Sequence, residues 1–431
     1  MIMKLSTHLS RDRFDWMQDS LRRRDHAVML VRVAGTLPEG YAVRPTDRAA
    51  SHLVVVLDRS GSMSGGRLEH AKRALVDVVG RLSPDDSFGL VTFDNRVEVV
   101  VPAGPVTDPA AVIRHIEGVH AGGSTDLGAG LVRGLEEARR IDVGAGVRVL
   151  LVSDGHANVG VTDPEALGGR VGAMRARGIT TSTLGVGLGY DETLLSTIAR
   201  AGAGNEHFAA EADAAAAAIG EECGELAAQR FLSVRLTIAA ASGIRGLDVV
   251  NDLPVVPVPG GIQVDLGSMR VDETRSLVVE CAPHPATRPG RRKIGKLRVD
   301  YVLADDLSDQ HTSTTVWTHV SRPDEREAGS DRQVLGEWYV QRVLRRRRKA
   351  LALLARGDDI RAAREFAKLA TLAHSAASKV PAAFRAELLR EAQEAERMAE
   401  PELFLAMAPD DRQFISKNMT ADGGRRSRRR S

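Results

Sequence analysis

Cysteine, net charge and long apolar runs are all scarce in this sequence of 431 residues. Its two cysteines, Cys223 and Cys281, lie far apart, so neither a disulfide framework nor a cysteine metal site is predicted. The amino end, residues 1–16, has no continuous apolar core, and no other stretch approaches the roughly 20 apolar residues of a membrane-spanning helix. We therefore expect a cytoplasmic protein without a membrane span. The net charge of +2 argues against a dedicated nucleic-acid binder.

The stretch that bears most of the chemistry is residues 53–66, LVVVLDRSGSMSGG. Its aliphatic start predicts a buried strand that ends at Asp58, and the apolar spacing of residues 67–82 predicts a helix. The glycines between them permit a tight loop, which brings Asp58, Ser60 and Ser62 to the carboxyl edge of a parallel sheet. Carboxylate and hydroxyl oxygens are the ligands that hard divalent cations such as Mg²⁺ prefer.

Three other interpretations of this loop are weighed against a metal site, and two of them require different residues. A phosphate-binding loop needs Lys and then Ser or Thr after its second glycine, but Arg67 and Leu68 stand there. A phosphotransfer aspartate at Asp58 would be expected to have a second carboxylate two residues later, where Ser60 stands. A turn whose serines only cap the following helix explains the loop as well, and it stays open on this stretch alone.

Two later motifs complement this loop. GGSTDL at residues 122–127 places Thr125 after two glycines, and LLVSDG at residues 150–155 follows an apolar run with Asp154. Together with DRSGS at residues 58–62, these motifs resemble the three loops of the von Willebrand factor type A (VWA) domain. The resemblance implies a doubly wound, Rossmann-like α/β fold with a metal-ion-dependent adhesion site (MIDAS). Its metal ligands would be Asp58, Ser60, Ser62, Thr125 and Asp154.

The resemblance also implies what such a site binds. The cofactor would be Mg²⁺, with Mn²⁺ or Ca²⁺ as alternatives, and one coordination position would accept a Glu or Asp carboxylate of a protein partner. The function would be metal-dependent protein binding without enzymatic activity. Two alternatives stay open: a Mg²⁺-dependent hydrolase or phosphotransferase with Asp58 as its nucleophile, and a scaffold with a structural metal.

Two residues beside the motifs have simpler expected roles. Asp126 stands where many members of the resembling family carry asparagine, and we expect it to be the N-cap of a helix that begins at Leu127. His156 is expected to be a surface or hydrogen-bonding residue. Strands predicted at residues 87–93, 97–101, 147–153, 179–186 and 206–209 alternate with helices predicted at 109–117, 127–141, 164–177, 192–201 and 212–229.

With 43% hydrophobic and 27% charged residues, a chain of this length is expected to form two or three globular domains.

The sequence on both sides of this α/β region predicts β-strands. We expect residues 1–50 and 223–320 to form one discontinuous antiparallel β-sandwich into which the VWA domain, residues 51–222, is inserted. This layout resembles inter-α-trypsin inhibitor heavy chains and their bacterial relatives. Alternation predicts strands at residues 5–9, 26–33, 231–239, 262–266, 277–281, 297–303 and 312–320, with turn material between them that includes 254–261.

Beyond residue 321 the composition changes to Ala, Arg, Glu and Leu, which predicts a small helical domain at residues 328–418. The basic run at residues 345–349 is expected to be solvated charge on buried aliphatic stems. Residues 419–431 are expected to be a disordered basic tail with weak attraction to anionic surfaces. Helices are predicted at residues 331–356, 358–379 and 381–400, with Asp358 as an N-cap.

Overall fold

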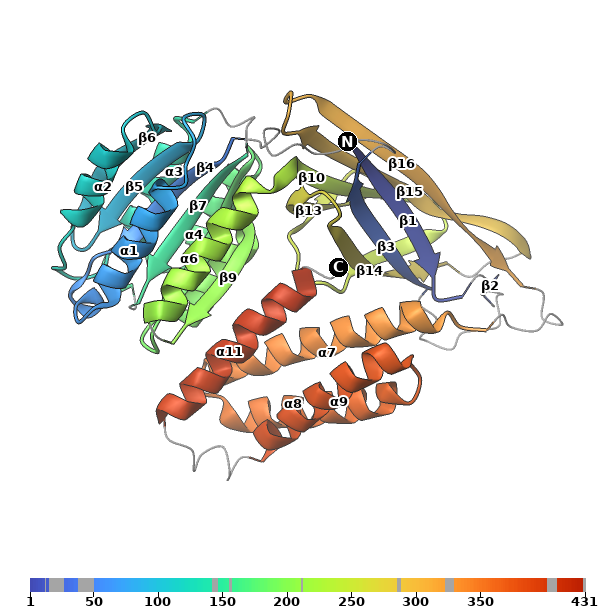
Figure 1. Cartoon of the computed structure of the whole chain (residues 1–431). Coiled ribbons are helices and arrows are strands. Elements are labelled where there is room, and N and C mark those ends of the chain that lie inside the picture. Colours follow the sequence, from blue (N-terminus) through green and yellow to red (C-terminus); the bar gives the residue numbers. More distant parts are fainter. Residues whose placement is uncertain are drawn as a thin grey trace.

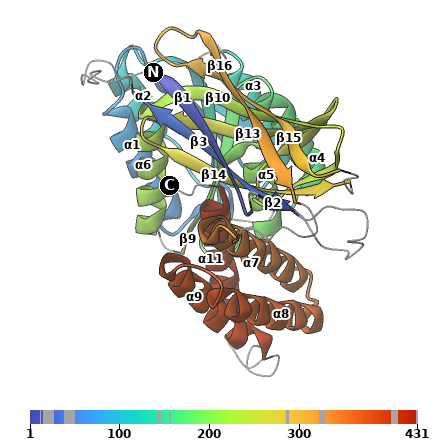
Figure 2. The same cartoon turned by 90° about the vertical axis from the view of Figure 1, so that its right-hand side faces the viewer.

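The computed structural model describes residues 1–11, 13–14, 27–37, 50–141, 146–154, 157–210, 212–284, 288–321, 329–400 and 409–428. These residues form an α/β region, two antiparallel sheets and a helical region. The helical region lies at one end of the molecule in both views (Figure 1 and Figure 2). Among the described residues, no helix is long and apolar enough to cross a membrane.

The α/β region has one six-stranded sheet, in the order β6-β5-β4-β7-β8-β9. All neighbouring strands are parallel except β5 and β6. The central strands β4 and β7 are rich in Val and Leu because both of their faces are buried. This arrangement confirms the predicted Rossmann-like α/β fold. The strands are β4 His52–Asp58, β5 Ser87–Phe93, β6 Val97–Pro105, β7 Val147–Ser153, β8 Ile179–Val186 and β9 Ala203–Ala209.

Helices cover this sheet on both faces. Successive residues of β4 point to opposite faces of the sheet and so belong to two different hydrophobic clusters. Leu53, Val55 and Leu57 pack against one group of helices. Val54 and Val56 pack against the other group. The carboxyl ends of β4 and β7 therefore lie between two helical layers. The first group is α1 Arg67–Val79, α2 Pro109–Glu117 and α6 Ala212–Ala227, and the second is α3 Leu127–Ala138, α4 Pro164–Arg175 and α5 Glu192–Ala201.

Strands from both flanks of the α/β region share sheets. β3 pairs antiparallel with β1 on one side and with β14 on the other. The sheet orders are β1-β3-β14-β11 and β12-β13-β10-β15-β16-β2, and buried residues of the two sheets form one hydrophobic cluster. A single β-sandwich domain stays a prediction, as do the domain boundaries. The strands are β1 Ile2–Leu9, β2 Arg13–Phe14, β3 Ala27–Thr36, β10 Gln229–Ala240, β11 Ile244–Val249, β12 Val255–Val258, β13 Gly261–Arg270, β14 Thr274–Pro283, β15 Gly290–Leu303 and β16 Asp309–Val320.

The expectation that residues 254–261 are only turn material is wrong. Strand β12 lies there and pairs with β13, with Val256 opposite Gln263. It is an edge strand in which Val255 and Val256 are 39% and 45% exposed. Because neither face is buried, β12 lacks the alternation of polar and apolar residues that identifies a strand from sequence.

The three predicted helices of the C-terminal region are confirmed. They are α7 Arg332–Leu354, α8 Asp359–Ala377 and α9 Ala382–Ala399. Asp358 has the predicted capping role, because its side chain accepts a hydrogen bond from the backbone N–H of Arg361 at the start of α8.

The expectation of a disordered tail is wrong for residues 419–428, and residues 429–431 lie outside the described residues. Helix α11 spans Pro409–Arg428 and contacts α7 and β9. Arg426 of this helix donates hydrogen bonds of 2.5 Å to Glu387 and 2.6 Å to Glu391, both on α9. These two partners on α9 precede Arg426 by more than 30 residues, so the composition of the tail does not predict the pairing.

The basic run at residues 345–349 is not simply solvated charge. The side chain of Arg347 is 2% exposed and donates a hydrogen bond of 2.9 Å to Glu391 and another to a carbonyl oxygen of α11. Arg345 donates a hydrogen bond of 2.6 Å to Asp248 on β11. Because successive helical residues point to different faces, this run joins α7 to the other helices and to a β-sheet.

Candidate metal centre

The first candidate metal loop begins where β4 ends. Asp58 is the last residue of that strand and is 0% exposed. Its Oδ1 accepts a hydrogen bond of 2.8 Å from the backbone N–H of Ser60, which folds the loop back over the end of the strand. One turn of 3₁₀ helix, Gly61–Met63, follows, and Gly66 with a φ of 104° leads into α1. Glycine adopts this left-handed conformation without steric cost, so Gly66 permits the tight return of the chain.

Hydroxyl groups join the first loop to the third. The hydroxyl oxygens of Ser60 and Ser62 are 3.0 Å apart, and Ser62 Oγ donates a hydrogen bond of 2.6 Å to Asp154 Oδ1. Ser153 Oγ donates a hydrogen bond of 2.6 Å to Asp58 Oδ2. These contacts arise because β4 and β7 are adjacent parallel strands whose carboxyl ends meet at one edge. The structure thus brings together four of the five predicted ligands.

Thr125, the fifth predicted ligand, lies on a loop that contacts the first one. Backbone hydrogen bonds of 2.8 Å and 3.1 Å join residues 122–123 to residues 59–61. Thr125 itself is 4% exposed, and its backbone N–H donates a hydrogen bond of 3.0 Å to Asn158 Oδ1. Within the described part of the chain, the contact between these loops is through the backbone, and no hydrogen bond joins the Thr125 hydroxyl to Asp58.

Asp126, next to this ligand, has the predicted capping role. Its side chain accepts a hydrogen bond of 2.9 Å from the backbone N–H of Ala129 at the start of α3. A carboxylate at this position satisfies a helix amide and opposes the positive end of the helix dipole. Asp126 is therefore engaged with α3. His156, beside the third loop, lies outside the described residues.

The two carboxylates of the site differ in how their charge is balanced. Burial raises the pKa of Asp58, although hydrogen bonds from Ser153 and Ser60 oppose the shift, and the nearby charge of Asp154 adds to it. Asp154 is paired with Arg67, whose Nη1 lies 2.7 Å from its Oδ2. By contrast, no Lys, Arg or His among the described residues forms an ion pair with Asp58.

The donor set fits a hard divalent cation. It consists of two carboxylates and nearby hydroxyl oxygens, which is the ligand chemistry of Mg²⁺ and related ions. A buried carboxylate is costly unless a positive charge lies beside it. A cation held next to Asp58 would supply the positive charge that none of the described side chains provides by direct pairing.

Two residues of this site, Ser153 and Arg67, are not among the ligands predicted from the sequence. Ser153 directly precedes Asp154 in the third motif, so a hydroxyl beside a predicted ligand was the available signal. Arg67 was considered only as the residue that excludes a phosphate-binding loop. Its contact with Asp154 joins residues 87 positions apart, so no local pattern indicates it.

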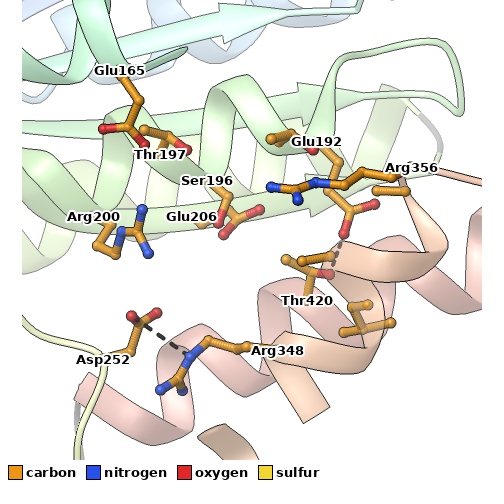
Figure 3. A pocket seen from close by; sticks show the side chains of 14 residues that line it. Glu165, Glu192, Ser196, Thr197, Arg200, Glu206, Asp252, Arg348, Arg356 and Thr420 are labelled. Atoms are coloured by element: carbon orange, nitrogen blue, oxygen red, sulfur yellow. Dashed lines mark hydrogen bonds and ion pairs between the residues drawn. The ribbon is translucent and has the colours of Figure 1, made fainter. Parts of the chain in front are cut away.

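A cavity of about 270 Å³ lies elsewhere, where α5, α7 and α11 meet. Figure 3 shows arginines and carboxylates together around it, and an ion pair of 3.7 Å joins Arg348 to Asp252. None of the residues that line this cavity belongs to the candidate metal loops. Its charged residues are Glu165, Glu192, Arg200, Glu206, Asp252, Arg348 and Arg356.

Comparison with known proteins shows which family part of this chain matches. Residues 52–221 match the family model of the von Willebrand factor type A domain. The uncharacterized protein YfbK of Escherichia coli is 35% identical over 162 residues, which are 37% of this chain and 28% of that protein. The uncharacterized protein sll0103 of Synechocystis is 28% identical over 280 residues, which are 62% of this chain and 64% of that protein. Human inter-alpha-trypsin inhibitor heavy chain H4 is 26% identical over 171 residues, 38% of this chain and 18% of its own.

Two solved structures share the fold over nearly the whole chain. A von Willebrand factor type A protein from Catenulispora acidiphila superposes with a TM-score of 0.73 at 16% identity, covering 99% of this chain and 97% of that one. The ArnB paralog VWA2 from Sulfolobus acidocaldarius superposes with a TM-score of 0.64 at 18% identity, covering 98% and 99%. At these identities the likeness establishes the fold alone.

Residues 52–221 of this chain are therefore a VWA domain. Domains of this family are commonly metal-dependent protein-interaction modules. The chain covers only 28% of YfbK, 64% of sll0103 and 18% of the human heavy chain. The activities and partners of those whole proteins do not transfer directly to this chain.

Proposed function

We propose that the chain binds a protein partner through a divalent cation held at the carboxyl edge of β4 and β7. The observation that carries this proposal is the Asp58 carboxylate, which is 0% exposed and lies among serines without an ion-pair partner in the described chain. The cation would be Mg²⁺, with Mn²⁺ or Ca²⁺ as alternatives. Its ligands would be Asp58, Ser60, Ser62, Thr125 and Asp154.

The chemistry of the partner follows from the charge of the site. Hydroxyl ligands are neutral, and the carboxylate of Asp154 is already paired with Arg67. A bound divalent cation would therefore keep positive charge, and Mg²⁺ usually retains several exchangeable waters in proteins. A Glu or Asp carboxylate of the partner would replace one such water, so the partner would bind only when the metal is present.

A hydrolase or phosphotransferase with Asp58 as its nucleophile fits the geometry less well. Asp58 Oδ1 accepts the backbone N–H of Ser60, and Oδ2 accepts the hydroxyl of Ser153. Both oxygens are engaged in a side chain that is 0% exposed, whereas a nucleophile must reach its substrate. We propose accordingly that the site binds and does not catalyse. The cytoplasmic location stays a prediction.

The deciding experiment measures partner binding with and without metal. The wild-type chain serves as bait in Mg²⁺ and in chelator, and a captured partner is then titrated calorimetrically against wild type and Thr125→Ala. We expect binding in Mg²⁺ only, and a roughly tenfold loss in Thr125→Ala because one metal ligand is removed. Changing the critical Glu or Asp of the partner to Gln or Asn should abolish binding.

A matched control removes a threonine outside the site. Thr107→Ala alters an exposed threonine in the turn before α2 and should leave the binding unchanged. Equal binding in Mg²⁺ and chelator would favour a scaffold with a structural metal and would contradict the proposal. Metal-dependent turnover of a phosphoester that is lost in Asp58→Ala would favour the enzyme instead.

A further inference from the structure

Arg67 is the first residue of α1, and its side chain reaches across to the third metal loop. Its Nη1 donates a hydrogen bond of 2.7 Å to Asp154 Oδ2 and one of 3.1 Å to the carbonyl oxygen of Ser62. The side chain of Arg67 is 42% exposed, whereas that of Asp154 is 0% exposed. The guanidinium therefore extends from the surface of the protein to a buried carboxylate of the proposed metal site.

The two oxygens of Asp154 have different partners. Oδ1 accepts the hydroxyl of Ser62 at 2.6 Å, and Oδ2 accepts the guanidinium of Arg67. A charge-assisted hydrogen bond of this kind is stronger than one between neutral groups, so Arg67 competes directly for the negative charge of Asp154. Asp58, in the same site, has no such competitor among the described residues.

The surrounding backbone is shaped to admit the guanidinium. Gly187, in the turn after β8, has a φ of +71°, and a Cβ at this position would lie 3.1 Å from Arg67 Nη2. A larger residue would be strained there and would also crowd the arginine. Arg67 is thus held between the Asp154 carboxylate and the β8 turn, in a position that the fold specifies.

We propose that Arg67 is a positioning residue that weakens the hold of Asp154 on the cation by pairing with one of its carboxylate oxygens. This inference rests on the proposed metal site. Without the charge of Arg67, Asp154 would offer its full negative charge to the cation, so the metal would bind more tightly. The cation would then attract a partner's carboxylate less strongly. Arg67 therefore lowers the affinity of the site for the metal and raises the affinity of the metal-bound site for an acidic partner.

The test uses Mg²⁺ alone as its probe and the full chain as the protein. Calorimetric titration should give a dissociation constant about tenfold lower for Arg67→Gln than for wild type, because a neighbouring positive charge is lost. Arg67→Lys keeps that charge and should restore an affinity close to that of wild type. Arg59→Gln is the matched control, because Arg59 lies in the same loop but pairs with Asp94 and Glu98. It should change the dissociation constant by no more than about twofold at physiological salt.

A double-mutant cycle separates this role from a general effect of charge. In an Asp154→Asn background, Arg67→Gln should no longer tighten Mg²⁺ binding, because the carboxylate through which Arg67 acts is absent. Equal effects of Arg67→Gln and Arg59→Gln, or weaker metal binding by Arg67→Gln, would overturn this inference and leave the metal site in place. Failure of the wild type to bind Mg²⁺ would overturn the proposed function as well.

Discussion

Two buried carboxylates in the α/β region have opposite surroundings. Asp58, at the end of β4, and Glu222, on α6, are each 0% exposed. The oxygens of Asp58 accept hydrogen bonds from the backbone N–H of Ser60 and the hydroxyl of Ser153. Burial raises its pKa. Glu222 is just as deeply buried, but its partners include an arginine.

Both carboxylate oxygens of Glu222 have hydrogen-bond partners within the folded chain, and one of these partners is a charged arginine. Its Oε1 accepts Arg148 Nη1 and Ser182 Oγ, both at 2.5 Å. Its Oε2 accepts Asn205 Nδ2 at 2.9 Å and lies 2.7 Å from His207 Nε2. Burial alone would raise the pKa of Glu222, but the charge of Arg148 and the hydrogen bonds from His207 and Asn205 hold it well below its usual range.

The comparison shows which carboxylate is structural and which is suited to a ligand. Glu222 has its positive charge within the fold and joins α6 to β7, β8 and β9. Asp58 has hydroxyl and amide donors but no ion pair among the described residues, and it lies at the sheet edge where parallel α/β folds bind ligands. Both carboxylates are equally buried, but only Glu222 has a positive side chain beside it. This difference is the physical reason to place a cation at Asp58.

The largest expected effect on the free energy of unfolding comes from breaking the buried ion pair between Arg148 and Glu222. Glu222→Gln should lower the free energy of unfolding by about 3–5 kcal/mol, because it leaves Arg148 as an uncompensated buried charge. Urea denaturation at pH 7 measures this change. Glu136→Gln is the control, since Glu136 pairs with Arg133 but has a side chain that is 53% exposed. It should cost less than about 0.5 kcal/mol, and an equal cost at both sites would contradict the comparison.

The same pair gives a defined dependence on pH. A carboxyl group whose pKa is lowered by folding contributes stability that is present above its ordinary value of 4.5 and is lost as the pH falls toward its pKa in the folded state. A protonated Glu222 is uncharged, and a glutamine at this position is uncharged too. The difference in unfolding free energy between wild type and Glu222→Gln should therefore narrow below pH 4.5. A difference that stays constant on acidification would contradict this assignment.

Asp58 should respond in the opposite way. In chelator, Asp58→Asn should leave the free energy of unfolding unchanged or slightly raised, because it removes a buried charge that has no ion-pair partner in the described chain. Mg²⁺ at 100 times its dissociation constant should stabilise the wild type by about 2.7 kcal/mol, and most of this gain should be missing in Asp58→Asn. Denaturation with and without Mg²⁺ measures both changes. Equal Mg²⁺-induced gains in the two proteins would place the metal elsewhere.

The candidate metal loops could be predicted because their chemistry is local in the sequence. Asp58, Ser60 and Ser62 lie within five positions, directly after an aliphatic run that can only be a buried strand or helix segment. The α/β fold brings the ends of parallel strands to one edge, so the approximate place of Asp154 followed from its own strand. Patterns that span only a few residues therefore predicted the strands and the first loop, whereas the choice of Thr125 and Asp154 as metal ligands came from the resemblance to the VWA domain.

The environment of Glu222 could not be predicted in this way. Arg148 and Glu222 are 74 positions apart, and an arginine in a strand usually indicates an exposed position. Only the packing of α6 on the sheet gives each of them a buried partner. Helix α11 was missed for a similar reason, since its Arg426 and Glu387 are 39 positions apart. Pairing over such distances has no periodic signal in a single sequence.

Lys417 on α11 is an intermediate case between the two carboxylates. It is 5% exposed, and its Nζ donates a hydrogen bond of 2.7 Å to the carbonyl oxygen of Tyr190 and lies 3.6 Å from the centroid of the Tyr190 ring. Burial lowers the pKa of Lys417, while the nearby charge of Glu192 opposes the shift. Its compensation is thus partial, and it combines the charge of Glu192 with direct contacts to the carbonyl oxygen and the ring of Tyr190.

The smallest of the three expected effects therefore belongs to Lys417→Met. It should lower the free energy of unfolding by only about 1 kcal/mol, because the loss of the hydrogen bond and the cation–π contact is partly offset by removal of a buried charge. The change should be local, so amide hydrogen exchange should accelerate in α11 more than in β4 or β7. Lys368→Met, at a side chain on α8 that is 62% exposed, is the control and should leave exchange in α11 unchanged. Unchanged protection of α11 in Lys417→Met would show that this contact does not hold the helix on the VWA domain, and it would contradict the intermediate position of Lys417 in this comparison.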